Sequence, residues 1–165
     1  MSQQERGVLR CRPLRPADRD FVLSLAARLE AAGMPPWREP QAMRAFHRRY
    51  AEALLATEGP EQLALIAEDA AGRPLGVVHV TGAESGLSGE AQGYLATLAV
   101  AAEAEGQGVG RALMAAAEEW ARSRGYRLLA LEVFAANERA RAFYRRLGYQ
   151  EETLTLVKEL RPDEG

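Results

Sequence analysis

The chain has 165 residues, of which 47% are hydrophobic, so it is long enough for one domain with a buried core and short for two. Its formal charge of −2, with both signs interspersed, gives no electrostatic reason to expect nucleic acid as a partner. No run approaches the roughly 20 apolar residues of a membrane span, and the single cysteine, Cys11, cannot form an internal disulfide. We therefore predict one cytoplasmic domain over residues 1–165, with neither membrane nor nucleic acid among its partners.

The first half of the chain alternates between strand and helix patterns. Apolar residues at helical spacing, such as Phe21, Leu25 and Leu29, mark the helices, and short apolar runs that flank turns mark the strands. The predicted elements are, in order, a strand over 8–14, a helix over 16–33, a loop over 34–40, a helix from 43 to about 57 and a hairpin of two strands over 63–68 and 75–80.

A glycine-rich segment, 105–111, stands between an apolar run over 94–100 and a helix with one apolar face. It reads Glu-Gly-Gln-Gly-Val-Gly-Arg, and glycine at every second position lets the backbone approach a ligand and take φ values that other residues avoid. The first amides of the helix that follows have no partner within it, so they can bind an anion with the help of the helix dipole. The segment therefore predicts a site for a phosphorylated ligand.

Two common phosphate-binding motifs do not fit this segment. A P-loop needs Gly-Lys-Ser/Thr, whereas Gly110 is followed by Arg111. A dinucleotide fingerprint counted from Gly106 would also place its last glycine on Arg111. The segment instead resembles the pyrophosphate loop of the GNAT superfamily of N-acyltransferases, usually Gln/Arg-x-x-Gly-x-Gly/Ala. Gly108 and Gly110 stand at its glycines, and Glu105 stands where Gln or Arg is usual.

A second segment, 137–149, carries the same resemblance. After a strand-like run over 128–134, Asn137 is a candidate N-cap and Gly148 a candidate stop of a short helix. The pattern Asn-x-x-Ala-x-x-Phe-Tyr-x-x-Leu-Gly-Tyr is similar to the second signature of the superfamily, one helix plus one strand after the glycine loop. The two segments in this order favour the GNAT reading over a plain glycine turn that enters a helix.

The resemblance implies an α/β fold, the GNAT fold, with a mixed central sheet of about six to seven strands. The order predicted along this chain is β-α-α-β-β-β-α-β-α-β. The fold usually closes with a two-strand hairpin, whereas residues 150–160 have room for only one long strand.

The resemblance also implies acetyl-coenzyme A (acetyl-CoA) as the acyl donor. Its pyrophosphate would lie on the glycine loop, and its pantetheine amides would pair with the preceding strand around Leu98 and Val100, which needs a partly opened ladder and usually a β-bulge. Asn137 would lie beside the cofactor arm, and Tyr144 would face the thioester sulfur. The predicted cofactor residues are Leu98, Val100, Gly106, Gln107, Gly108, Val109, Gly110, Arg111, Asn137 and Tyr144.

No cysteine or serine stands in a pattern that would make it a covalent acyl carrier. The simplest activity is therefore that of an N-acetyltransferase, in which a bound primary amine attacks the thioester of acetyl-CoA directly in a ternary complex. An aliphatic amine with a pKa of roughly 10.4 is neutral only about 4 times in 10,000 at pH 7, a handicap of roughly 4.6 kcal/mol. Some group or water chain must therefore take up its proton, and desolvation of the amine can contribute by lowering its pKa. The resemblance nominates Tyr144 as the acid that protonates the leaving thiolate, and a purely packing aromatic is the alternative.

The proton acceptor is left open. Tyr94 opens the cofactor strand at a place where some relatives carry a proton acceptor. Three glutamates and two histidines are further candidates, each with a structural role as its alternative: Glu84, Glu90, Glu132, His47 and His79. No cluster has metal-ligand spacing, so we predict no metal.

The acceptor is predicted only as a small-molecule or peptide amine. In the family the first two helices and their loop wall the acceptor pocket, which nominates Trp37, Phe46, His47 and Tyr50, because an aromatic ring can cage a cationic amine. Trp37 can equally cover the core. Monomer and homodimer are both open. The alternative function is a non-catalytic acyl-CoA-binding sensor or partner-binding module, whose hallmark would be loss of Tyr144 or of the glycines.

Overall fold

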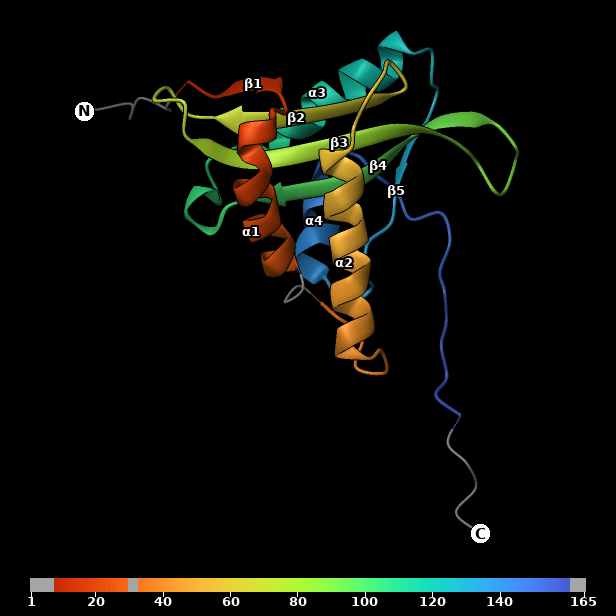
Figure 1. Cartoon of the computed structure of the whole chain (residues 1–165). Helices are drawn as coiled ribbons and strands as arrows, with labels where there is room; N and C mark the ends of the chain where they lie inside the picture. Colours follow the sequence, from red (N-terminus) through yellow and green to blue (C-terminus); the bar gives the residue numbers. More distant parts are fainter. Residues whose placement is uncertain (1–7, 30–32, 161–165) are drawn as a thin grey trace, which may run out of the picture.

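The computed structural model describes residues 8–29 and 33–160. Its centre is a five-stranded sheet in the order β1-β2-β3-β4-β5 (Figure 1). Neighbours from β1 to β4 are antiparallel, and β5 is parallel to β4. The strands are β1 (Arg10–Pro13), β2 (Gln62–Glu68), β3 (Pro74–Glu84), β4 (Ala91–Val100) and β5 (Leu129–Leu131).

Helices cover both faces of the sheet. Figure 1 shows α1 and α2 in front of it and α3 behind it. The α-helices are α1 (Arg19–Leu29), α2 (Pro40–Leu55), α3 (Val109–Ser123) and α4 (Glu138–Arg146), and the short 3-10 helices are η1 (Pro16–Asp18) and η2 (Ala102–Ala104). The predicted start of α2 was too late, because Pro40 is its first residue, a position that needs no backbone N–H.

The core lies between α3 and the middle strands. The side chains of Ile66, Val78 and Leu113 are completely buried. Because helices cover both faces, every residue from 75 to 80 in the centre of β3 is buried, and all of them but His79 are apolar. Gly76 allows α3 to approach closely, since a Cβ there would lie 2.9 Å from Cγ1 of Val109.

A buried ion-pair network fixes β1 at one edge of the sheet. The Arg12 guanidinium donates to both carboxylate oxygens of Asp18, each at 2.8 Å, and to Glu68 Oε2 at 2.6 Å. Arg12 is only 7% exposed, and its proximity holds the pKa of Asp18 below its ordinary value. Cys11 lies beside it in β1, as predicted, and burial raises the pKa of its thiol.

Two predictions about the other edge of the sheet are wrong. The strand expected over 128–134 forms only at Leu129–Leu131, and the long strand expected over 150–160 does not form. The described residues therefore hold five strands, where six to seven were expected. Residues 150–160 form no ladder and extend exposed from the body (Figure 1). From β1 to α4 the elements follow the predicted order, and both ends of the predicted domain lie outside the described residues.

Candidate active site

The ladder between β3 and β4 changes register near its middle. His79 is opposite Thr97, but Val80 is opposite Leu95, so Ala96 is an extra residue on β4. β5 pairs with β4 only as far as Leu95, and beyond it no described strand lies against that edge of β4. The bulge bends β4 away from β5 and gives the opened ladder that the resemblance requires.

Leu98 and Val100 lie on this open stretch with their backbone polar groups directed away from β3. Gly76 is opposite Val100, and the amide of Ala101 donates to the carbonyl of Leu75 at 2.8 Å. In an antiparallel ladder this makes Val100 a member of a non-hydrogen-bonded pair, and alternation gives Leu98 the same orientation. The N–H and C=O groups of both residues therefore point toward the open edge.

The glycine loop ends at the first turn of α3. Gly106 and Gly108 have φ values of 74° and 84°, which explains why both are glycine. A Cβ at either position would meet nothing within 4 Å, so the loop borders open space. Gly108 is the N-cap of α3, and the helix amides that follow it have no partner within the helix. Loop and helix dipole together offer an anion a cradle of backbone donors.

The other residues of the loop have different surroundings. A Cβ at Gly110 would lie 3.2 Å from Cζ of Phe143, so this glycine permits α4 to pack against α3. The side chain of Val109 is buried in the core, which leaves only its backbone for a ligand. The Gln107 side chain donates to a backbone carbonyl at 2.9 Å, and the side chain of Arg111 is exposed.

Glu105 connects the glycine loop to two arginines that the sequence reasoning missed. Its carboxylate pairs with Arg28 of α1 and, at 2.6 Å, with Arg139 of α4. Arg28 also donates to the carbonyl of Val100, one of the groups directed toward the open edge. This explains how Glu can stand where the family pattern has Gln or Arg. The separation along the chain hid the cluster, and the unusual Glu105 was its only signal.

Asn137 is the N-cap of α4, as predicted. Its side-chain oxygen accepts from the amide of Ala140 at 3.2 Å. Gly33 lies directly against it, because a Cβ on Gly33 would come within 2.9 Å of Cβ of Asn137. Gly33 has a φ of 71°, so its left-handed backbone and this close approach both require glycine.

Tyr144 lies in a cluster of three aromatic rings against the core. Its ring meets Phe143 and Tyr149 edge-on, with centroids 5.2 and 5.7 Å away. Burial raises the pKa of Tyr144 to about 12, so its hydroxyl is protonated at neutral pH. The Tyr149 hydroxyl donates instead to Glu118 at 3.2 Å. The packing predicted as the alternative for Tyr144 is therefore present, together with a protonated hydroxyl.

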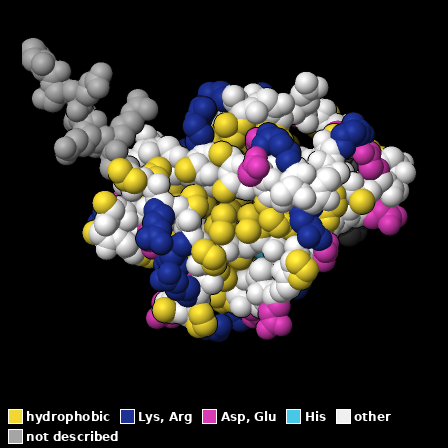
Figure 2. Space-filling model, turned by 90° about the horizontal axis from the view of Figure 1, so that it is seen from above, with side chains coloured by type: hydrophobic (Ala, Val, Ile, Leu, Met, Phe, Trp, Pro, Cys, Tyr) yellow, Lys and Arg dark blue, Asp and Glu magenta, His cyan; other side chains and the backbone are white. Residues whose placement is uncertain are grey.

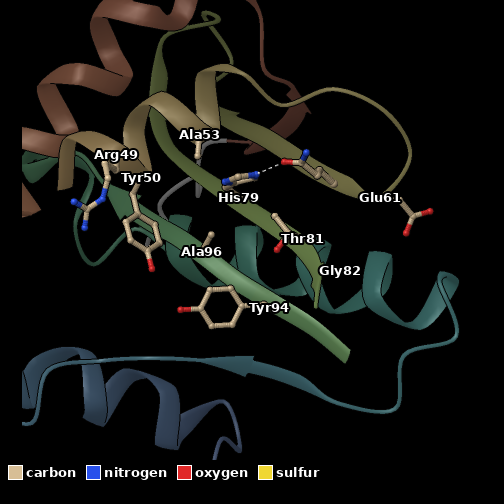
Figure 3. A pocket seen from close by; sticks show the side chains of 10 residues that line it. Arg49, Tyr50, Ala53, Glu61, His79, Thr81, Gly82, Tyr94 and Ala96 are labelled. Carbon is tan, nitrogen blue, oxygen red and sulfur yellow. Dashed lines mark hydrogen bonds between the residues drawn. The ribbon is translucent and has the colours of Figure 1, made fainter. Parts of the chain in front are cut away.

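A cavity of about 520 Å³ opens on the α2 side of the bulge (Figure 3). Tyr50 reaches it from α2, and Tyr94 and Ala96 reach it from β4. The remaining lining residues are Arg49, Ala53, Glu61, Gln62, His79, Thr81 and Gly82. Most of them come from β2 and β3, which the sequence reasoning did not connect with a pocket.

His79 lies at the buried end of this cavity. Its Nε2 is 2.9 Å from Oε1 of Gln62 and 3.2 Å from the hydroxyl of Thr57. Burial lowers the pKa of His79 to about 4, so the ring is neutral at pH 7. Its Nδ1 and the hydroxyl of Thr97, on the facing strand, are buried without a hydrogen-bond partner among the described residues. The predicted structural role of His79 fits better than that of a base.

Two of the other base candidates, Tyr94 and Glu90, are poorly suited as well. Burial and a hydrogen bond to Tyr50 raise the pKa of Tyr94, so Tyr94 is a donor at neutral pH. The carboxylate of Glu132 lies close enough to add to this rise. Glu90 is held by Arg127 through two hydrogen bonds of 2.7 and 2.8 Å, which lowers its pKa. Glu84 lies at the exposed end of β3.

The aromatic residues nominated for the acceptor pocket differ in whether they line a cavity. Phe46 contacts His47 and Tyr50, with ring centroids 5.3 and 4.8 Å away, and Arg49 lies over its ring at 6.0 Å. Of the nominated residues only Tyr50 lines the large cavity, while His47 and Tyr50 border a smaller apolar one between α2 and the sheet. Trp37 is 46% exposed and lines neither.

A model of the acetyltransferase (GNAT) family matches residues 26–149. The chain belongs to this family. Over 55 residues it is 42% identical to the uncharacterized N-acetyltransferase YycN of Bacillus subtilis, a match that covers 33% of this chain and 35% of that protein. The match thus spans about a third of its relative's length.

Solved structures agree with the GNAT fold. The GCN5-related N-acetyltransferase of Ralstonia eutropha has a TM-score of 0.69 at 24% identity, over 93% of this chain and 99% of that chain. AAC(6')-Iy, in complex with the bisubstrate analog CoA-S-monomethyl-acetylneamine, has a TM-score of 0.66 at 18% identity, over 94% and 99%. At these identities the likeness shows the fold alone.

The surface of this GNAT chain is mixed in charge. On the face that Figure 2 shows, Lys and Arg side chains stand in separate groups beside Asp and Glu, around a band of hydrophobic side chains. None of the described helices is both long and apolar enough to cross a bilayer. Among residues 8–29 and 33–160, no three His, Cys, Asp or Glu side chains are grouped as metal ligands.

Proposed function

We propose that this chain is an N-acetyltransferase that moves an acetyl group from acetyl-CoA to a primary amine in a ternary complex. One observation carries the proposal: the open edge of β4 leads directly to a left-handed glycine loop at the start of α3. An extended amide chain and an anionic phosphate group would meet complementary backbone groups in that order.

The donor is held mainly by backbone. The N–H and C=O groups of Leu98 and the N–H of Val100 would pair with pantetheine amides, and the amides from Gly106 to Arg111 would bind the pyrophosphate. Arg28 and Arg139, which converge on Glu105, add positive charge beside this cradle. Asn137 would lie at the cofactor arm while it caps α4.

When bound, acetyl-CoA supplies the thioester that the acceptor amine attacks directly. Tyr144 would protonate the leaving thiolate, because its raised pKa of about 12 keeps a proton on the hydroxyl at neutral pH. We expect this proton to be worth on the order of 10- to 10³-fold in rate.

The acceptor would bind in the cavity beside the bulge. The hydroxyls of Tyr50 and Tyr94 and the buried ring of His79 provide donors and acceptors there, and Arg49 and Glu61 provide charge of both signs. None of the lining groups with a shifted pKa is a strong base at pH 7. Partial desolvation of the amine, with release of its proton to water, fits this lining best. The acceptor class remains a small-molecule or peptide amine.

A panel of primary amines, assayed for release of free thiol from acetyl-CoA, tests this function. We expect release that depends on the amine, with acetylated amine found by mass spectrometry. If acetyl-CoA binds but no amine of the panel stimulates release, the non-catalytic acyl-CoA-binding module replaces this proposal.

A further inference from the structure

Helix α2 carries arginines that have no carboxylate partner. Arg44, Arg48 and Arg49 are exposed on it, and no Asp or Glu in the described part of the chain lies within ion-pair distance of any of them. Even Glu52, one turn after Arg48 on the same helix, does not pair with it. Most of the other described arginines do pair with a carboxylate. Helix α2 therefore presents positive charge that the fold itself does not compensate.

One of these arginines, Arg49, lines the cavity beside the bulge. It comes from the same wall as Tyr50 and Ala53 (Figure 3). Its guanidinium carbon lies 6.0 Å from the centre of the Phe46 ring, a cation–π contact that holds the group at this wall. Its N–H donors have no acceptor among the described residues, and their planar fork fits a carboxylate or a phosphate. Arg49 is therefore a candidate anion site in the wall of the acceptor cavity.

The negative charge near the cavity lies on other elements. Glu61 also lines the cavity, but Arg124 pairs with it and offsets its charge. Glu132 pairs with no cation among the described residues, and it lies close enough to Tyr94 to help raise the pKa of that hydroxyl. Tyr94 belongs to β4, whereas Arg49 belongs to α2 (Figure 3). An unpaired carboxylate thus lies near the β4 wall, and an unpaired guanidinium lies at the α2 wall.

This distribution of charge would orient an acceptor that has charges of both signs. Its ammonium group would be attracted to the β4 wall, near the extra residue Ala96, and its anionic group to Arg49. The open edge of β4, where the donor is proposed to lie, begins just beyond the same bulge. The amine would then face the donor, with the anionic group held on the other side of the cavity. An acceptor without an anionic group would leave Arg49 unpaired and gain no such orientation.

We propose that the acceptor carries an anionic group, a carboxylate or a phosphate, beside its primary amine, and that Arg49 binds this group. The inference rests on the proposed function, because it takes the cavity as the acceptor site. Arg49 would determine which amines bind and take no part in the transfer itself. Arg44 and Arg48 continue the positive charge along α2, so an acidic peptide that extends out of the cavity would meet them as well.

Matched pairs of acceptors test this inference. The pairs are 4-aminobutyrate and butylamine, phosphoethanolamine and ethanolamine, and the amidated peptides Ala-Glu-Glu and Ala-Gln-Gln. They offer the anion as a small carboxylate, as a phosphate or as acidic side chains of a peptide, so the preferred pair identifies its source. In at least one pair we expect kcat/KM to be higher for the anionic member by about tenfold or more. Equal kcat/KM values within every pair, or a preference for the neutral members, would overturn the proposal.

Arg49→Gln and Arg48→Gln form a matched pair of variants. Both remove an exposed, unpaired guanidinium from α2, but only Arg49 lines the cavity. Arg49→Gln should lower the preference for the anionic acceptor about tenfold, mainly through KM. Arg48→Gln should leave that preference unchanged within about twofold. Equal losses of preference would assign the effect to the general charge of α2 and would overturn the role of Arg49.

Calorimetric titration of the same amines in the presence of CoA separates this inference from the proposed function. If no amine is acetylated, binding of an anionic member about tenfold tighter than its neutral partner, lost in Arg49→Gln, would support the anion site while the proposed function fails. Acetylation of amines regardless of their charge would support the function and overturn the anion site. Equal affinities within every pair would overturn the anion site as well.

Discussion

The two halves of the sheet differ in how completely their strands are paired. From β1 to β3 the ladders are almost continuous, and the helices on both faces bury the central strand from Leu75 to Val80. From the bulge in β4 to the short β5 the ladder opens, and backbone donors and acceptors are left without strand partners in the described part of the chain. The closed half is stabilised by its own side chains, whereas the open half has backbone groups with which the proposed donor would pair.

This difference predicts where substitutions act. In the closed half they should change the free energy of unfolding and leave acetyl-CoA affinity unchanged. In the open half they should change acetyl-CoA affinity or rate, whether or not they also change stability.

The largest effect is expected from Arg12→Met in the closed half. The substitution leaves Asp18 and Glu68 as buried charges without their partner, so the free energy of unfolding should fall by about 3–5 kcal/mol. Arg10→Met is the matched control, because the Arg10 side chain is 71% exposed and its ion pair with Glu68 is long, at 3.9 Å. Urea denaturation measures both. Equal losses of unfolding free energy in the two variants would show that burial of the ion-pair network adds nothing to stability.

Tyr144→Phe tests the open half through rate. It removes one hydroxyl from a packed ring, so kcat should fall on the order of 10- to 10³-fold with little change in stability. Tyr149→Phe, in the same aromatic cluster, loses a hydrogen bond to Glu118 instead and should keep its kcat within about twofold. Full turnover by Tyr144→Phe would remove its role as the acid.

The pH dependence of stability should carry the signature of His79. Its pKa is about 4 in the folded protein against 6.5 ordinarily, so between these values the unfolded chain binds a proton that the folded chain does not. The free energy of unfolding should therefore be unaffected above pH 6.5 and fall by about 3 kcal/mol as the pH drops to 4. Thermal unfolding of the wild type and His79→Gln over this range measures it, and identical slopes would refute the assignment.

The smallest effect compares two glycines with the same backbone strain. Gly108 and Gly125 have φ values of 84° and 77°, and a Cβ on either would meet nothing within 4 Å. Alanine at each should destabilise the fold by a similar amount, about 1 kcal/mol. Only Gly108→Ala should also weaken acetyl-CoA binding, by about tenfold, roughly 1.4 kcal/mol. Calorimetric titration with acetyl-CoA measures the affinity of each variant. Equal affinities of Gly108→Ala and Gly125→Ala would show that acetyl-CoA binds away from the glycine loop.

Local patterns predicted most of the fold and the donor side of the site. The glycine loop, the N-cap at Asn137 and the run that became β4 are short segments whose conformation depends on their own residues. What the sequence did not reveal depends on distant partners. Arg12 is 56 positions from Glu68, and Glu105 is 77 from Arg28.

The prediction for β5 failed because of its neighbour. Whether a β-type sequence forms a strand depends on whether a neighbour is present, and the bulge at Ala96 withdraws one neighbour from β5. The acceptor pocket was also predicted incompletely, because six of its ten lining residues come from β2, β3 and β4 and not from the first two helices.

Binding of the donor tests the account most directly. Thermal unfolding should be followed with acetyl-CoA at 100-fold its dissociation constant, and with ATP and NADH at the same concentration. Binding to the folded state alone should add about 2.7 kcal/mol with acetyl-CoA and little with the other two ligands. No stabilisation by any acyl-CoA, or equal stabilisation by all three ligands, would contradict the claim that the open edge of β4 and the glycine loop bind acetyl-CoA.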